Sequence, residues 1–130
     1  MTQQKNALIE DFMTPFPHTI GEEQNLIKAK EILREYHCHH LPVKHGGKLV
    51  GILSSSDLRF ASKAEDLNKI TVGDVMTTDI LEVPTHTPLR EAVEKMLENH
   101  CSSVLVTRKP GDLLGIFTWI DLARAHLKLG

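Results

Sequence analysis

The sequence predicts a mixed α/β (α+β) fold built from two β-α-β-β-α repeats related by a pseudo-two-fold axis. The first observation is an internal duplication, because residues 11–14 (Asp-Phe-Met-Thr) recur as residues 74–77 (Asp-Val-Met-Thr). The second is a shared strand-to-helix pattern, since residues 51–57 (Gly-Ile-Leu-Ser-Ser-Ser-Asp) recur as residues 115–121 (Gly-Ile-Phe-Thr-Trp-Ile-Asp). The third is composition: the 130 residues are 41% hydrophobic and 25% charged, which is ordinary for a globular domain. Each half is too small to bury a sheet face alone, so we expect the halves to share one core.

The duplication also predicts how the chain is divided. The matched positions place repeat 1 at residues 9–61 and repeat 2 at residues 70–128, within a single module of residues 1–130. Residues 62–69 are mostly polar and are expected to form a linker between the repeats.

The first repeat has an order of elements that its apolar pattern predicts. A short strand is expected around residues 18–20, after two prolines that interrupt the chain. Apolar residues at helical spacing from Leu26 to Tyr36 then predict a helix with one buried face. A buried strand at 41–43, a return strand at 49–53 and a closing helix from Ser54 complete the repeat.

The second repeat follows the same order. A strand is expected at residues 80–83, and apolar residues from Leu89 to Leu97 predict the long helix. Thr87 is expected to cap this helix, with Pro88 in its first turn. A buried strand at 104–106, a return strand at 113–117 and a closing helix from Thr118 complete the repeat.

The duplicated [Ser/Thr]-x-x-Asp pattern has two interpretations. Ser54 with Asp57, and Thr118 with Asp121, have the spacing of a helix N-cap and a favourable acid in the first turn. The alternative is a nucleotide site, in which the hydroxyl and the helix N-terminus face a phosphate while the carboxylate accepts hydrogen bonds from ribose hydroxyls. A single match favours the cap, and its recurrence within a longer repeat favours the nucleotide site.

Charge and composition exclude some classes of function. A net charge of −2 and a pI near 6.4 disfavour a nucleic-acid surface, which usually needs a basic face. No apolar run is long enough to cross a membrane, and no signal-peptide pattern opens the chain. Two cysteines without a secretory signal are typical of free thiols in a reducing compartment. We therefore expect a cytoplasmic protein.

Taken together, these motifs resemble a tandem pair of CBS (cystathionine-β-synthase) domains, the arrangement called a Bateman module. The resemblance rests on the paired Asp-x-Met-Thr segments, on the helix followed by His40-Leu41-Pro42-Val43, and on Gly-x-x-[Ser/Thr]-x-x-Asp closing each repeat. It covers roughly residues 9–126. It implies clefts at the interface of the two repeats, and modules that pair into homodimers.

The resemblance implies regulation rather than catalysis. Members of the family bind adenosine-containing ligands such as AMP, ADP or ATP, as in energy sensing, and control another protein; no cofactor is required and no catalytic residue is expected. By position, Asp57 and Asp121 match the ribose-binding acid, and Ser54 and Thr118 match the phosphate-facing hydroxyl. The further ligand contacts implied are Ser56 before the first acid, Arg59 after it, and Thr19, Ile20, His40 and Pro42 around the base.

The two sites are expected to be unequal. Ser56 places a hydroxyl directly before Asp57, whereas Ile120 occupies that position before Asp121 and cannot donate a hydrogen bond. We therefore predict that the Asp57 site is the stronger one and the better equipped for phosphates. Arg59 is open between a phosphate or partner contact and simple exposure, and Trp119 between a dimer surface and a cleft wall.

The histidines and cysteines suggest two other chemistries. His37-Cys38 recurs as His100-Cys101 without a second pair of zinc-type spacing, so a shared helix end explains it more simply than a metal site. A nucleophilic Cys38 lacks an orienting acid. His39 and His40 are specific to the first repeat, and for them ligand contact and a surface loop both stay open.

The leading hypothesis is a non-catalytic module that senses an adenine nucleotide and controls an unknown partner protein. The alternatives are a sensor of S-adenosylmethionine or NAD, and a ligand-free dimerisation scaffold.

Overall fold

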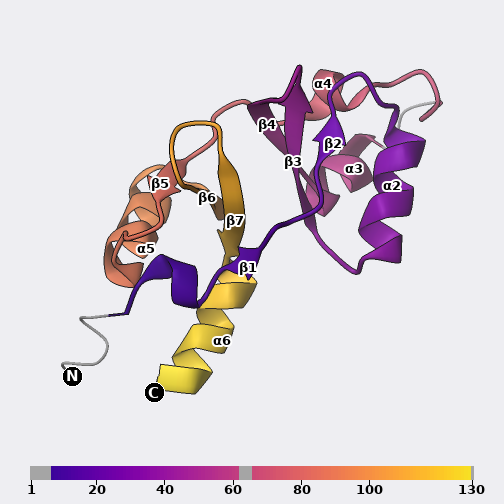
Figure 1. Cartoon of the computed structure of the whole chain (residues 1–130). Coiled ribbons are helices and arrows are strands. Elements are labelled where there is room, and N and C mark those ends of the chain that lie inside the picture. Colours follow the sequence, from indigo (N-terminus) through magenta and orange to yellow (C-terminus); the bar gives the residue numbers. More distant parts are fainter. Residues whose placement is uncertain (1–6, 62–65, 130) are drawn as a thin grey trace. The chain divides into compact units, whose positions relative to one another are not determined.

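The computed structural model describes residues 7–61 and 66–129, so residues 62–65 of the expected linker lie outside the described part. The chain divides into two compact units. The central unit runs from His18 to Ile80, and the C-terminal unit combines the chain up to Pro17 with the chain from Leu81 onward. Each unit joins a small sheet to helices (Figure 1), which confirms the predicted mixed α/β class.

The central unit has a three-stranded sheet in the order β2-β3-β4. Strands β2 and β3 are parallel, β3 and β4 are antiparallel, and a helix follows β2 and another follows β4. This is the β-α-β-β-α order that the sequence predicts. The elements are β2 (Ile20–Gly21), α2 (Leu26–Glu35), β3 (His40–His45), β4 (Lys48–Ser54), α3 (Ser55–Ala61) and α4 (Val72–Val75).

The C-terminal unit repeats this topology and adds one strand, giving the order β1-β7-β6-β5. Strands β5 and β6 are parallel, and β7 is antiparallel to both β6 and β1. The elements are the 3-10 helix η1 (Ile9–Asp11), β1 (Thr14–Pro15), β5 (Glu82–Pro84), α5 (Leu89–Glu98), β6 (Ser103–Thr107), β7 (Leu113–Thr118) and α6 (Trp119–Leu129).

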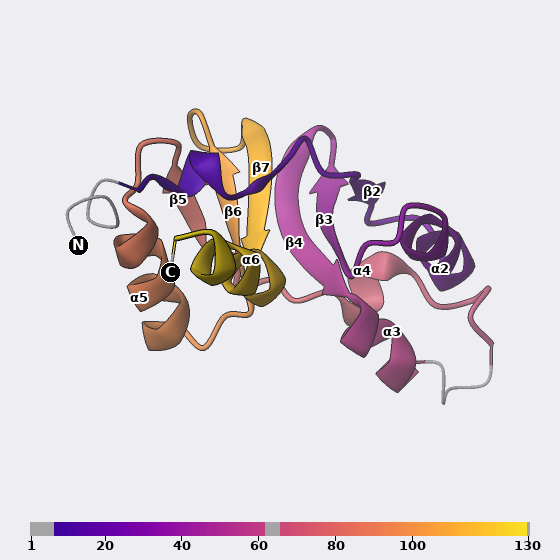
Figure 2. The ribbon, with the colours of Figure 1, turned by 90° about the horizontal axis from the view of Figure 1, so that it is seen from below.

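Each unit has its own hydrophobic cluster, which differs from the expectation of one shared core. In the C-terminal unit, Met96 of α5 and Ala125 of α6 pack with Phe117 of β7, and Figure 2 shows both helices on the same side of their sheet. Tyr36 and Leu97, expected on the buried helix faces, are instead exposed because each lies at the helix end.

Each repeat begins with a leading segment that carries its Asp-x-Met-Thr motif, residues 9–17 in repeat 1 and residues 70–80 in repeat 2. Each leading segment packs in the compact unit that contains most of the other repeat. Thr14 of β1 lies opposite Ile116 of β7. At the matching position, Thr77 and Ile52 exchange two backbone hydrogen bonds of 2.9 Å. The compact units therefore do not coincide with the sequence repeats, and a repeat cut at residues 9–61 lacks the segment that pairs with its own return strand.

Two glycines make room for the leading segments. A Cβ on Gly51 would lie 2.7 Å from Met76 Sδ and 2.8 Å from the Thr77 carbonyl oxygen, and a Cβ on Gly115 would meet the side chain of Met13. The Met of each Asp-x-Met-Thr motif therefore needs the Gly that opens the other repeat's strand-to-helix motif. This contact gives a physical reason for two motifs that the sequence shows only as separate patterns.

Gly51→Ala is expected to lower the free energy of unfolding by about 1–3 kcal/mol, because the added methyl meets backbone that cannot move without breaking the bridge to Ile52. Urea denaturation measures the change. Adding Met76→Ala should not restore stability, because the Thr77 carbonyl remains. Adding Met13→Ala to Gly115→Ala should restore it in part, because the three atoms nearest that Cβ all belong to Met13. Wild-type stability in Gly51→Ala would contradict this account.

The repeated His-Cys pair is explained by how α2 and α5 end. His37 and His100 have φ values of 52° and 54°, the left-handed conformation that commonly follows a helix. The next N–H groups, of Cys38 and Cys101, donate back to the carbonyls of Leu33 and Met96. At the start of α5 the expectation was wrong: Thr87 does not cap the helix, because its hydroxyl donates to the Pro84 carbonyl at 2.7 Å.

Candidate ligand-binding sites

Ser54 and Asp57 form a reciprocal capping box at the start of α3. The Asp57 N–H donates to Ser54 Oγ at 3.1 Å, and the Ser54 N–H donates to Asp57 Oδ2 at 2.9 Å. The capping interpretation of this motif is therefore realised in the structure. Asp57 is half-buried. Among the described residues, the Ser54 N–H donates a hydrogen bond to the Asp57 carboxylate, and the oxygen that accepts this bond is Oδ2 rather than Oδ1.

Other predicted contact residues gather around this box. His40 lies directly opposite Ser54 in the β3–β4 pairing. The Ser55 N–H donates to the His39 carbonyl at 2.8 Å, and Ser55 Oγ lies 3.4 Å from His39 Nδ1. Arg59 Nη2 donates to Ser56 Oγ at 3.3 Å. The structure thus brings a hydroxyl, a carboxylate, imidazoles and a guanidinium to one end of β4.

The residues predicted near the base lie farther along the sheet. Pro42 pairs with Ile52, two residues from the His40–Ser54 pair, and Ile20 of β2 pairs with Val43. Ile20 and Pro42 are buried, while Thr19 is half-buried. Within the central unit, Thr19 is therefore the more accessible of these three side chains, and Ile20 and Pro42 contribute to packing.

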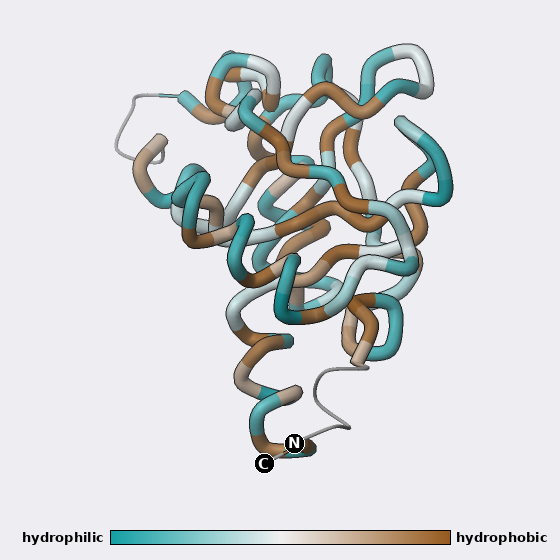
Figure 3. Tube along the Cα trace, turned by 90° about the vertical axis from the view of Figure 1, so that its left-hand side faces the viewer, coloured by the Kyte–Doolittle hydropathy of each residue, from teal (hydrophilic) through white to brown (hydrophobic). Residues whose placement is uncertain are grey.

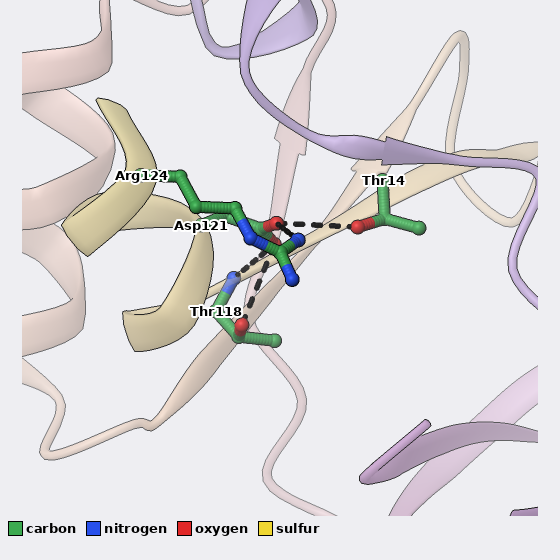
Figure 4. Close-up of polar contacts among 4 residues, drawn as sticks. All are labelled: Thr14, Thr118, Asp121 and Arg124. Atoms are coloured by element: carbon green, nitrogen blue, oxygen red, sulfur yellow. Dashed lines mark hydrogen bonds and ion pairs between the residues drawn. The ribbon is translucent and has the colours of Figure 1, made fainter. Parts of the chain in front are cut away.

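Asp121 occupies the matching place in the C-terminal unit with more partners (Figure 4). Its Oδ2 accepts from the Thr118 N–H at 3.0 Å and lies 3.4 Å from Thr118 Oγ1. Its Oδ1 accepts from Thr14 Oγ1 at 3.2 Å and lies 3.7 Å from Arg124 Nη1. Only 5% of Asp121 is exposed. Both oxygens of this carboxylate are thus engaged within the protein.

A cavity adjoins each acid, and the two cavities have different walls. The cavity beside Asp57 has a volume of about 400 Å³ and is lined by Phe60, Ala61, Ile70 and Val75. The cavity beside Asp121 has about 260 Å³. Its lining residues are Asp11, Phe12, Met13, Thr14, Pro15, Asp121, Arg124, Ala125 and Lys128.

Metal and thiol chemistry have little geometric basis in the described ranges. Over residues 7–61 and 66–129, no group of three or more His, Cys, Asp or Glu side chains is placed to hold a metal ion. Burial raises the pKa of the Cys38 thiol, which disfavours the reactive thiolate. Within the same ranges, no helix has the length and apolarity needed to cross a membrane.

Sequence reasoning missed two residues beside the acids. Thr14 ties the leading segment to Asp121, and its signal was its recurrence as Thr77 in the Asp-x-Met-Thr motif. Phe60 lines the Asp57 cavity, and a signal was available in the alignment of the two repeats, which sets it opposite Arg124.

Comparison with known proteins identifies relatives of both repeats. A family model of the CBS domain matches residues 9–64 and 72–128. The chain is 31% identical over 119 residues to L-aspartate semialdehyde sulfurtransferase of Methanocaldococcus jannaschii, an alignment that covers 91% of this chain and 23% of the relative. The chain therefore spans about a quarter of that relative's length.

Two solved structures resemble most of the chain. The CBS domain pair of protein MJ0100, in complex with 5′-methylthioadenosine and S-adenosyl-L-methionine, is 28% identical with a TM-score of 0.85, covering 95% of this chain and 98% of that chain. CBSX2 in complex with AMP is 31% identical with a TM-score of 0.76, with the same coverage of 95% and 98%.

Proposed function

The chain belongs to the CBS domain family, with two copies in tandem as its motifs predict, and from this premise we propose that it is a regulatory module that binds an adenosine-containing ligand. AMP, ADP and ATP are the first candidates, and S-adenosylmethionine or NAD the alternative. The observation that carries the proposal is the half-buried Asp57 carboxylate beside an open cavity. Similarity to pairs crystallised with AMP, 5′-methylthioadenosine and S-adenosylmethionine supports the ligand class.

The proposed contacts follow from the geometry of each unit. Asp57 accepts hydrogen bonds from the ribose hydroxyls, with the Ser54, Ser56 and Arg59 side chains near the 5′ end of the ligand. Asp121 with Thr118 forms a second site in the C-terminal unit. The sequence prediction that Asp57 is the stronger site gains support from its single described hydrogen bond, since Asp121 is held by Thr14, Thr118 and Arg124.

The proposed mechanism is a population shift rather than catalysis. A ligand that binds one conformation better than another moves the equilibrium by no more than its differential affinity for the two. The protein that this change regulates is proposed to be a separate partner protein. The module is proposed to act in the cytoplasm, where adenine nucleotides are abundant.

Exposed apolar residues on α6 support a homodimer. Ile120 and Leu127, which are 46% and 83% exposed, lie seven residues apart and therefore on one helix face. Trp119 precedes them and is 38% exposed. The hydrophobic and hydrophilic colours alternate along this helix in Figure 3. We propose that this face meets a second copy of the module.

A thermal-shift screen tests the proposed function. A ligand at 100 times its Kd stabilises the folded state by about 2.7 kcal/mol, and each kcal/mol raises Tm by roughly 3–6 °C for a chain of this size. We expect a rise of about 8 °C or more with at least one of AMP, ADP, ATP, NAD, S-adenosylmethionine and 5′-methylthioadenosine. Inosine serves as the control for base recognition. Unchanged melting with every ligand would contradict the proposal and favour the ligand-free scaffold.

A further inference from the structure

The Met13 side chain lies where the leading segment of repeat 1 meets the sheet of the C-terminal unit. Its Sδ, Cγ and Cε are the three atoms nearest to a Cβ built on Gly115, so the thioether lies directly on the backbone of β7. Met13 packs against the hydrophobic cluster of this unit and is only half-buried. It also lines the cavity of about 260 Å³ beside Asp121. The thioether therefore combines a packing role with access for a small solute.

Two other methionines provide an internal comparison. Met76 occupies the matching place in the central unit, where its Sδ lies 2.7 Å from a Cβ built on Gly51. Met76 is also half-buried, but it lines neither of the two cavities described above. Met96 of α5 is 0% exposed. Access to the sulfur is therefore expected to decrease from Met13 to Met76 to Met96.

An accessible thioether reacts with peroxides. A lone pair of the sulfur attacks one oxygen of hydrogen peroxide and the O–O bond breaks. The sulfur loses two electrons and becomes a sulfoxide, while the other oxygen leaves as hydroxide and takes up the remaining proton to form water. The product is a polar, chiral side chain that disrupts apolar packing. At Met13 the new oxygen would enter a contact made with the hydrophobic cluster and the Gly115 backbone, where a polar atom without a donor is unfavourable.

We propose that Met13 is a peroxide-sensitive modification site, and that its sulfoxide loosens the leading segment of repeat 1 from β7. The contacts that weaken with it are the strand pairing of Thr14 with Ile116 and the 2.8 Å hydrogen bond from the Phe16 N–H to the Leu114 carbonyl. At the same peroxide dose the matching segment of the central unit stays in place. This site needs no bound ligand, so its failure and the failure of the proposed function are separate results.

Treatment of the full chain with hydrogen peroxide, followed by peptide mass spectrometry and by melting, tests the proposal. Met13 is expected to gain one oxygen at least about tenfold faster than Met96, and faster than Met76. Tm should fall by about 5 °C or more in step with the oxidation of Met13. A mixture of both methionine sulfoxide reductases with a thiol should restore Tm, because these enzymes return the sulfoxide to the thioether.

Amide hydrogen exchange identifies the part of the chain that loosens. In the oxidised protein the Phe16 N–H, which donates to the Leu114 carbonyl, should exchange at least about tenfold faster than in the untreated protein. The N–H groups of Ile52 and Thr77, which bond to each other's carbonyls in the central unit, are the matched reference and should keep their rates.

Three variants assign the effect to Met13. Met13→Leu keeps an apolar side chain of similar volume and both cysteines, so it should fold normally and lose the Tm response to peroxide. Met76→Leu, the matched control, should keep that response. Met13→Gln places a polar side chain of similar length at the site and should lower Tm without peroxide. The proposal is overturned if Met13 stays unmodified at doses that oxidise Met76, if Met13→Leu responds as the wild type does, or if oxidised Met13 leaves the Phe16 exchange rate unchanged.

Discussion

Replacing Asp57 with alanine is expected to weaken binding of the adenosine ligand at the central unit by about 100-fold or more. A carboxylate that accepts from two ribose hydroxyls makes two charge-assisted hydrogen bonds, each worth about 1.5–3 kcal/mol. The same change removes one half of the capping box and should lower the free energy of unfolding by only about 1 kcal/mol. Binding should therefore fall far more than stability does, as calorimetry and urea denaturation together measure.

A 2′-deoxy ligand identifies the role of the carboxylate. The wild type should bind the 2′-deoxy analogue more weakly than the parent ligand by about 1–3 kcal/mol. Asp57→Ala should bind the two ligands almost equally, because the partner of the 2′ hydroxyl is already absent. An equal preference for the parent ligand in wild type and variant would remove Asp57 from this role. Loss of binding in Asp121→Ala but not in Asp57→Ala would contradict the predicted ranking of the sites.

Asp121→Ala is expected to act mainly on the fold, lowering the free energy of unfolding by about 2–4 kcal/mol. Asp121 is 5% exposed and accepts hydrogen bonds from the Thr118 N–H and from the Thr14 hydroxyl. Its removal takes away a charged acceptor from both donors, and a hydrogen bond to a charged group contributes about 1.5–3 kcal/mol, less where water can replace the acceptor, as at the exposed Thr14. The Thr14 contact also joins β1 to the start of α6, so the leading segment should loosen.

Two further variants assign the stability loss to its source. Thr14→Val removes the hydroxyl but keeps the shape of the side chain, and should account for about 1 kcal/mol of the effect. In an Asp121→Ala background, Thr14→Val should cost much less than in the wild type, because the pair is already broken. Equal stability of Asp121→Ala and Asp57→Ala would show that the extra contacts of Asp121 do not stabilise the fold.

Hydrophobic periodicity predicted the elements well because each helix and strand has a short, local signal. The buried residues Leu26, Ala29 and Leu33 of α2 show the 3.6-residue spacing of an amphipathic helix, and the duplicated motif revealed the second copy. Thr87 was assigned wrongly because two roles compete for its hydroxyl, a helix cap and a turn back to Pro84, and spacing does not distinguish them.

The sequence predicted which residues stand at the centre of each candidate site, but not the residues that surround them. Ser54, Asp57, Thr118 and Asp121 stand at the helix starts where the repeated motif places them. Their surroundings were not predictable, because the residues beside the acids come from distant segments. Thr14 reaches Asp121 across 107 positions, and Ile70 and Val75 reach the Asp57 cavity from beyond the end of the first repeat.

By itself, then, the sequence determined that this protein is a duplicated CBS pair, which elements it has, and which carboxylate stands at each helix start. Only the tertiary structure decided that the leading segments exchange between units, that Met13 and Met76 lie against Gly115 and Gly51, and that one acid is enclosed while the other stays accessible. The physical reason is the range of the interactions. Periodicity and capping act within one or two helical turns, whereas packing depends on which distant side chains the folded chain brings into contact.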